Sequence, residues 1–283
     1  MTDNPSDYLQ IWLDLRNCTL ATLEGRVGIE QSKMFNENLN RSDQRSNALY
    51  GNLVVAYASN ILRDNRPGYA RIVLEWFSPI DSNRPSAMER LALEQNEFTV
   101  AKIDRYEGYF EKARQRLTPP SKEDVRLAGV SACNRISQLA AVHCELGENG
   151  LAEGLLRQEI KFIDEVGLNN TPSARCLQLT LAEVLLAQSL PKDAEDLYLK
   201  IGSVVQDCDY NTPTRIAHLR MCVGLARASH MQGFWPGALN LWGTALIASE
   251  ACDWRAGFIE MVIRYSMSHV KSVLDGRNDI ELI

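Results

Sequence analysis

Apolar side chains recur at intervals of three and four residues along most of this chain, and one small pattern within them returns five times. Each copy has an alanine, a second alanine twelve residues later, and a bulky apolar residue four residues after that. The second alanines, which we call anchors, lie 43, 39, 42 and 44 residues apart. The alanine pairs are Ala58 and Ala70, Ala101 and Ala113, Ala140 and Ala152, Ala182 and Ala194, and Ala226 and Ala238. A period of this size predicts a solenoid built from one repeated unit.

Each unit is predicted to be a pair of antiparallel helices. Thr171 and Thr212 each precede a proline, which is typical of a hydroxyl N-cap before the first helical residue. From Thr171 the sequence runs through LQLTLAEVLLAQ, where apolar residues step at helical intervals, and Pro191 then starts the second helix. Glycines are expected in the turns of the other units, where positive φ is often needed: Gly68, Gly108, Gly147 and Gly233.

The anchor alanines are predicted to lie where the two helices of a unit cross. A larger residue there would push the helix axes apart from their contact distance of about 8–10 Å. Leu197, Tyr198 and Ile201 are expected to fill the space between neighbouring hairpins. Trp235 and Trp242 are likewise predicted to be core residues, with the wall of a small-molecule pocket as the alternative.

The two ends of the chain are expected to cap this array, because terminal units of a solenoid need capping. Residues 1–42 contain an amphipathic segment, residues 43–251 hold the five hairpins, and residues 252–283 provide a capping helix and tail. The apolar residues expected to cover the last hairpin are Trp254, Phe258, Met261, Val262 and Tyr265. We therefore predict an all-α fold, a right-handed α-α superhelix of about five hairpins, as a single domain over residues 1–283.

The spacing of small and bulky positions resembles the tetratricopeptide repeat. The resemblance covers about residues 43–251 and is clearest in LAAVHCELGENGLAEGLL (139–156), LAEVLLAQSLPKDAEDLY (181–198) and LARASHMQGFWPGALNLW (225–242). The units are longer than the 34 residues usual in that family. They depart from its pattern at Glu159 and Ile201, where a small residue is usual, and at Asp104 and Ser229, where an aromatic is usual.

The resemblance implies that the first helices of the hairpins line a concave groove that binds a protein or peptide. The implied groove positions lie 18, 15, 11, 8 and 7 residues before each anchor. Five of the seven charged residues at these positions are basic, and the two acids are Glu145 and Glu183. The candidate binding residues are Arg63, Lys102, Arg105, Tyr106, Asn134, Arg220, Arg227 and His230. One hypothesis is an acidic peptide or a carboxylate ligand held through arginine pairs; the other is an ordinary solvated helix face.

One known partner class of the family is disfavoured. The carboxylate clamp that holds chaperone tails needs Lys and Asn at set inner positions. The corresponding residues here include Phe98, Thr99 and Thr180.

Composition and charge narrow the classes of partner and compartment. The chain has 283 residues, 45% of them hydrophobic, and a formal net charge of -6. Nucleic-acid binders and proteins that bind anionic membranes usually carry a basic excess, so neither partner is expected. The seven cysteines are scattered singly, which favours a reducing compartment and predicts a cytoplasmic location.

The sequence offers no recognised catalytic motif, so we predict no catalytic residue, no metal and no cofactor. His218 and Cys222 share a helical face without a third ligand, and His143 and Cys144 point about 100° apart on a helix. The segment Asp207-Cys208-Asp209 is interpreted as a turn. Two functions remain: an interaction scaffold, which we favour, and a helical-repeat enzyme of cyclase or isomerase type that only shapes an apolar substrate.

Overall fold

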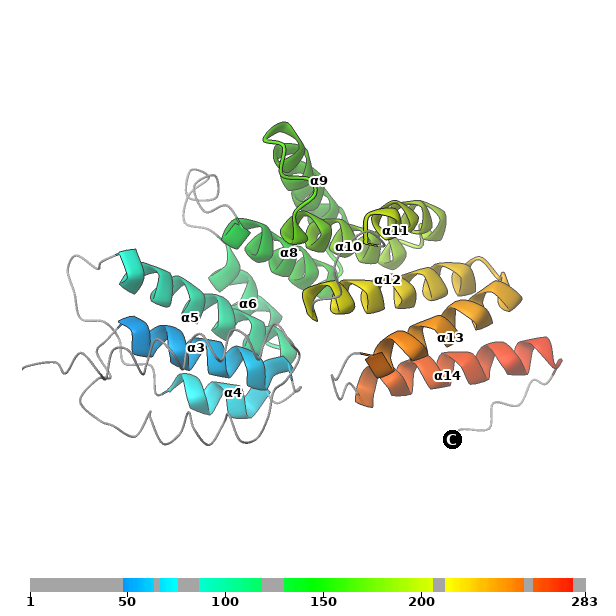
Figure 1. Cartoon of the computed structure of the whole chain (residues 1–283), viewed down its shortest axis with the longest axis horizontal. Helices are drawn as coiled ribbons and strands as arrows, with labels where there is room; N and C mark the ends of the chain where they lie inside the picture. Colours follow the sequence, from blue (N-terminus) through cyan, green and yellow to red (C-terminus); the bar gives the residue numbers. More distant parts are fainter. Residues whose placement is uncertain are drawn as a thin grey trace, which may run out of the picture. The chain divides into compact units, whose positions relative to one another are not determined.

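The computed structural model describes residues 48–63, 67–75, 87–118, 130–205, 212–251 and 257–276. These residues form eleven α-helices and no β-strand (Figure 1). The helices are α3 (Ala48–Arg63), α4 (Pro67–Leu74), α5 (Ala87–Tyr106), α6 (Phe110–Leu117), α8 (Val130–Glu145), α9 (Asn149–Glu165), α10 (Pro172–Ala187), α11 (Pro191–Val205), α12 (Thr212–Met231), α13 (Trp235–Ala251) and α14 (Gly257–Leu274). Within each unit, helices that follow one another in the chain pack together, so the predicted all-α array of hairpins is confirmed. The expected N-terminal capping segment, residues 1–42, lies outside the described residues.

The chain divides into two compact units, with the boundary between Arg116 and Leu117. In unit 1, α3 packs against both α4 and α5, and the core contains Val54, Ile61 and Ile103. In unit 2, α8 pairs with α9, α10 with α11, and α12 with α13, while α14 packs on α13. Helix α10 also contacts α8 and α12, so the first helices of these three hairpins form one layer with a continuous apolar core. Each unit is a stack of helix hairpins, and that the two make a single domain stays a prediction.

The alanine register is confirmed by burial. All ten alanines of the repeated pairs are fully buried, and the two members of each pair lie on the two helices of one hairpin. Because each hairpin places alanine at both positions, its helices approach closely without a void.

A second repeated feature lies in the turns, five residues before the anchor. The backbone there is left-handed in all four described turns, at Gly108, Gly147, Ser189 and Gly233. The amide of the next residue donates to the carbonyl five residues before it, for example from Tyr109 to Asp104 at 2.7 Å, and the other three turns repeat this at 2.8–3.0 Å. This bond is that of a Schellman motif, which favours glycine because positive φ brings no Cβ clash.

The predicted N-cap at Thr171 is confirmed, the start of α12 lies one residue before its predicted position, and the predicted turn at Gly68 is wrong. Thr171 caps α10, where its side-chain oxygen accepts the Ala174 amide at 3.2 Å, and Pro172 is the first helical residue. Helix α12 begins at Thr212, so this threonine is the first helical residue, whereas the sequence predicted it as the N-cap before Pro213. Gly68 does not occupy a turn, because α4 begins at Pro67 and carries Gly68 as its second residue without a positive φ.

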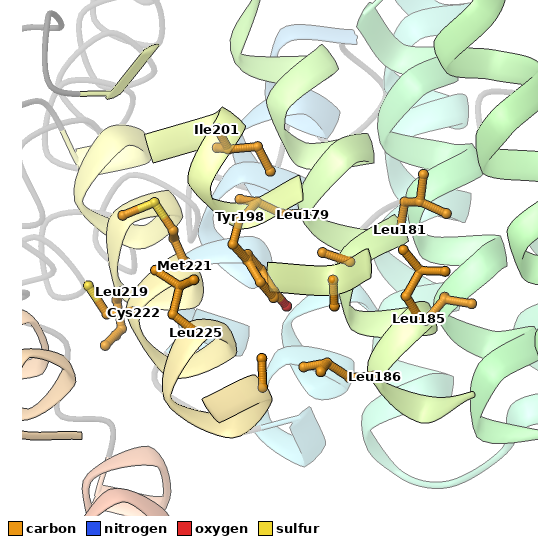
Figure 2. Packing of buried hydrophobic residues seen from close by; sticks show 14 of the residues in the cluster. Leu179, Leu181, Leu185, Leu186, Tyr198, Ile201, Leu219, Met221, Cys222 and Leu225 are labelled. Carbon is orange, nitrogen blue, oxygen red and sulfur yellow. The ribbon is translucent and has the colours of Figure 1, made fainter. Parts of the chain in front are cut away.

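Tyr198 and Ile201 fill the apolar space between the fourth and fifth hairpins as predicted (Figure 2), whereas Leu197 is only half-buried. The Tyr198 ring extends from α11 onto the backbone of α12, where it lies against Gly224. Burial raises the pKa of its hydroxyl, which has no hydrogen-bond partner within the described residues. Trp242 is buried in the same core, which agrees with its predicted packing role.

The predicted C-terminal helix is present as α14, but the residues predicted to form its buried face are wrong. The stripe that packs against the core is Ile259, Ile263, Met267 and Val270, at intervals of four, four and three residues, with Ile263 and Val270 fully buried. Met261, Val262 and Tyr265 are instead exposed, by 59%, 37% and 53%. Helix α14 has apolar residues on more than one of its faces. The sequence alone therefore did not indicate which face packs against α13. Trp254 and the side chain of Phe258 lie outside the described residues.

Candidate binding surfaces

The five expected groove positions divide into two groups by exposure. None of the described residues at 18, 11 and 7 positions before the anchors is buried, whereas five of the ten at positions 15 and 8 are buried. The offsets 18, 11 and 7 differ by seven and four residues, which keeps them on one helical stripe. The solvent-facing stripe is therefore narrower than expected, and Arg105 and His230 lie on its flank.

In unit 1 this stripe runs along α5 as Gln95, Lys102 and Tyr106, flanked by Phe98 and Arg105. The Lys102 ammonium lies 5.8 Å from the centre of the Phe98 ring, within the range of a cation–π contact. Tyr106 is 50% exposed at the end of the helix. We call Phe98, Lys102, Arg105 and Tyr106 the α5 face. Arg63 is the last residue of α3, and its side chain lies outside the described residues.

Three acids of this region, Glu97 and Asp104 of α5 and Glu107 just after it, are bound by arginines of the neighbouring helices. Arg71 of α4 donates from Nη2 to Asp104 at 2.8 Å and to Glu107 at 2.6 Å. Arg116 of α6 donates from Nε to Asp104 at 3.0 Å and from Nη1 to Glu97 at 2.7 Å. Asp104 is thus buried between two guanidinium groups, which explains why an acid stands where the resembled family has an aromatic. The pairing directs these three acids towards α4 and α6, while Lys102 and Arg105 lie on the α5 face, about two and three turns beyond the exposed Glu94.

A hydroxyl contact joins neighbouring first helices in both units. Thr99 and Thr180 lie 14 residues before their anchors, and each donates to the carbonyl four residues earlier, at 2.8 and 2.9 Å. Thr99 also bonds Ser59 of α3 at 3.2 Å, and Thr180 bonds Ser137 of α8 at 2.8 Å. These threonines are buried within the seam between helices, so they are not groove ligands.

In unit 2 the predicted basic residue Arg220 is bound within the protein. Its Nε and Nη2 atoms donate to the two carboxylate oxygens of Glu183 at 2.9 and 2.8 Å, and Nη2 also donates to Thr180 at 3.1 Å. Its Nη1 atom lies 3.6 Å from the Cys176 sulfur. Arg220 therefore joins α12 to α10, and its charge is matched by Glu183.

This pairing changes the electrostatics expected for the groove. In unit 2 the charged candidates are Arg220, Arg227, Glu145 and Glu183, whose formal charges cancel. The basic excess read from the whole sequence therefore belongs to unit 1, to Arg63, Lys102 and Arg105. Asn134 is half-buried on α8, and Arg227 is exposed on α12 two turns after Arg220.

His230 belongs to an aromatic cluster that joins the last hairpin to α14. Its ring stacks on His269 of α14 with centroids 5.1 Å apart and planes at 17°, and the edge contact with Trp235 has centroids 5.2 Å apart. Burial and the neighbouring His269 both lower the pKa of His230. His230 therefore packs within unit 2, which sequence reasoning missed because His269 lies 39 residues away.

The cysteines and histidines singled out in the sequence do not form a reactive thiolate site in the described part of the chain. His218 Nε2 lies 3.5 Å from Cys222 Sγ, but burial raises the pKa of Cys222 to about 11. Cys133 also has a pKa raised to about 11 by burial and by Glu159. His143 binds Glu148 at 2.5 Å. A thiolate at neutral pH is therefore disfavoured at Cys133 and Cys222.

Within the same residues, no three His, Cys, Asp or Glu side chains gather closely enough to hold a metal ion. None of the helices described is both long enough and apolar enough to cross a membrane. The predicted turn at Asp207-Cys208-Asp209 lies outside the described residues.

The comparisons with known proteins give no family. The sequence matches no protein-family model and no curated protein.

Proposed function

We propose that the protein is a non-catalytic interaction scaffold that binds a carboxylate-bearing segment of a partner protein on the α5 face. The observation that carries this proposal is the separation of charge on the C-terminal half of α5, from Gln95 onwards. Glu97, Asp104 and Glu107 are held by arginines of α4 and α6, while the α5 face has two bases and two aromatic residues. The proposal includes membership of the tetratricopeptide-like class, supported by the ten buried alanines and the repeated turn geometry, and a cytoplasmic location, supported by the odd number of cysteines.

The chemistry of the α5 face suits an acidic segment with some apolar content. A guanidinium such as that of Arg105 can bind a carboxylate through two parallel hydrogen bonds, whereas the Lys102 ammonium acts as a mobile point charge. Tyr106 and Phe98 offer ring surface for an apolar side chain beside the carboxylate. Because both bases are half-exposed, their contribution is screened by salt over a distance of about 8 Å at physiological ionic strength.

The experiment is affinity capture from a cytosolic extract, with the full chain as bait and mass spectrometry as readout. We expect Lys102→Glu combined with Arg105→Glu to reduce capture of an acidic partner about tenfold or more, corresponding to at least about 1.4 kcal/mol. Raised salt should weaken capture by the wild type in the same direction. The melting temperature should change little, because both side chains reach solvent.

The matched control is Lys161→Glu combined with Lys271→Glu. It makes the same change in net charge at two exposed lysines of unit 2. Unchanged capture by the α5-face variant, or an equal loss in the control, would overturn the proposal. A small-molecule product formed by the purified protein alone would favour the enzyme alternative.

A further inference from the structure

Unit 2 has a second surface that the sequence did not indicate, a groove between α9 and α11 with α10 as its floor. The groove has a volume of about 410 Å³. Its apolar lining comes from all three helices: Ile160 of α9, Leu181 and Leu185 of α10, and Leu197 of α11. We call it the outer groove, because its two walls are second helices of hairpins.

The length of the outer groove fits a helical segment. Residues from Asp193 to Lys200 of α11 line it, and residues seven apart on a helix are separated by about 10 Å along the axis. Two turns of a bound helix span the same distance and would present apolar side chains at i, i+3 or i+4, and i+7. Leu181 and Leu185 of the floor lie four residues apart, about one helical turn along α10.

The rim of the outer groove has more acids than bases. Asp164 of α9 and Asp193 and Asp196 of α11 line it, and none of the three makes an ion pair or a side-chain hydrogen bond within the described part of the chain. Two bases also line the groove: Arg157, whose Nε lies 2.7 Å from a carboxylate oxygen of Glu153, and Lys200 at the end of the α11 lining. Carboxylates without partners beside an apolar floor favour a cationic, amphipathic ligand.

We propose that the outer groove binds an amphipathic helical segment of a partner protein, with two or three aliphatic side chains on the floor and Lys or Arg against the aspartates. The α5 face prefers the opposite charge, so one chain presents sites for two chemically different partners. This inference does not depend on the function of the α5 face. It assigns to the scaffold a bridging role between an acidic segment and a basic segment.

The test uses the full chain and a synthetic helical peptide of about two heptads, with Leu at i, i+3, i+4 and i+7 and Lys at the flanking positions. Methyl NMR spectra of the protein should show shifts centred on Ile160, Leu181, Leu185 and Leu197. A second peptide with Glu in place of each Lys should bind at least about tenfold more weakly. Both results together place the peptide in the outer groove and show its charge preference.

Two variants test the site. Asp193→Lys combined with Asp196→Lys changes two exposed residues and should weaken binding of the Lys peptide about tenfold or more. Its control is Glu250→Lys combined with Asp275→Lys, which makes the same change in net charge at exposed positions away from the rim. A third variant, Gln178→Trp, fills part of the floor without changing charge and should also weaken binding.

Four outcomes would overturn the proposal. They are methyl shifts confined to residues elsewhere, equal affinity for the Lys and Glu peptides, equal weakening by the rim and control variants, and no binding of the Lys peptide at about millimolar concentration. The variant Lys102→Glu with Arg105→Glu should leave Lys-peptide binding unchanged. Its result therefore separates a failure of the outer groove from a failure of the α5 face.

Discussion

Gly224 of α12 is the residue at which one added methyl group has the most predictable effect. A Cβ atom built on Gly224 would lie 2.1 Å from Cζ and 2.4 Å from the hydroxyl oxygen of Tyr198. Ordinary contact starts at about 3.4 Å, so the ring would have to withdraw by about 1.3 Å. Tyr198 is fully buried among side chains of α10 and α12, and the close packing there leaves no space for that movement (Figure 2).

The magnitude follows from two opposing terms. Alanine is a better helix former than glycine by about 0.8–1 kcal/mol, so Gly224→Ala would stabilise an unobstructed helix. Overpacking of a buried contact costs about 1–3 kcal/mol and occasionally more. Because the overlap with Tyr198 is severe, we expect the packing term to win, with a net loss of about 1–2 kcal/mol. In a protein of this size such a loss lowers the melting temperature by about 2–8 °C.

Thermal unfolding followed by far-UV circular dichroism measures this effect, and Gly154→Ala is its control. Gly154 is an exposed residue of α9 with no heavy atom within 4 Å of its added Cβ, so that substitution should raise the melting temperature. Tyr198→Leu should reduce the cost of Gly224→Ala, since it removes the ring atoms that clash. Equal stabilisation by Gly224→Ala and Gly154→Ala would refute the packing described here.

Three further predictions concern stability. Ala194→Leu should destabilise by about 1–3 kcal/mol, because Ala194 is fully buried at a helix crossing; an unchanged melting temperature would contradict the register. Ser189→Gly should stabilise by about 0.5–1 kcal/mol, because Ser189 has a φ of 61° where the other described turns use glycine; urea unfolding of the two proteins tests this. The lowered pKa of His230 means that the folded state binds its proton less readily than the unfolded state, so stability should fall as pH drops below about 6.5. The decrease in melting temperature from about pH 7.5 to about pH 5 should be smaller in His230→Phe than in the wild type, and equal decreases would argue against the stacked pair with His269.

The hairpins could be predicted because their determinants are local. An alanine at a helix crossing, a threonine before a proline and a turn about five residues before an anchor are all set by neighbours in the sequence. The turn of the fourth hairpin could not be predicted from its residue type. Ser189 adopts the same left-handed backbone as the glycines of the other turns, and only the repeat register, not the residue type, could have indicated it.

The partners of charged side chains could not be predicted in the same way. Arg220 and Glu183 lie 37 residues apart, and Arg71 and Glu107 lie 36 residues apart. A repeat predicts that residues one period apart lie on equivalent helices of neighbouring hairpins. It does not predict which of their side chains form hydrogen bonds or ion pairs. Counting charges at the expected groove positions therefore treated Arg220 as a ligand group, although Glu183 binds it. The outer groove was missed for a related reason, since its lining comes from three helices whose spacing depends on tertiary packing.

Residues at one repeat position have different interactions in different hairpins. Nine residues before the anchors stand Asp104, held by two arginines; His143, bound to Glu148; Leu185, at the floor of the outer groove; and Ser229, which donates to the Phe234 carbonyl at 3.2 Å. The anchor alanines and the left-handed turns define the backbone on both sides of this position, so its side chain can vary without loss of the hairpin. Binding specificity in this protein should therefore lie in residues that break the repeat. The charge separation on α5 depends on such a residue, because Asp104 holds both arginines in unit 1, whereas the corresponding Leu185 helps to form an apolar surface in unit 2.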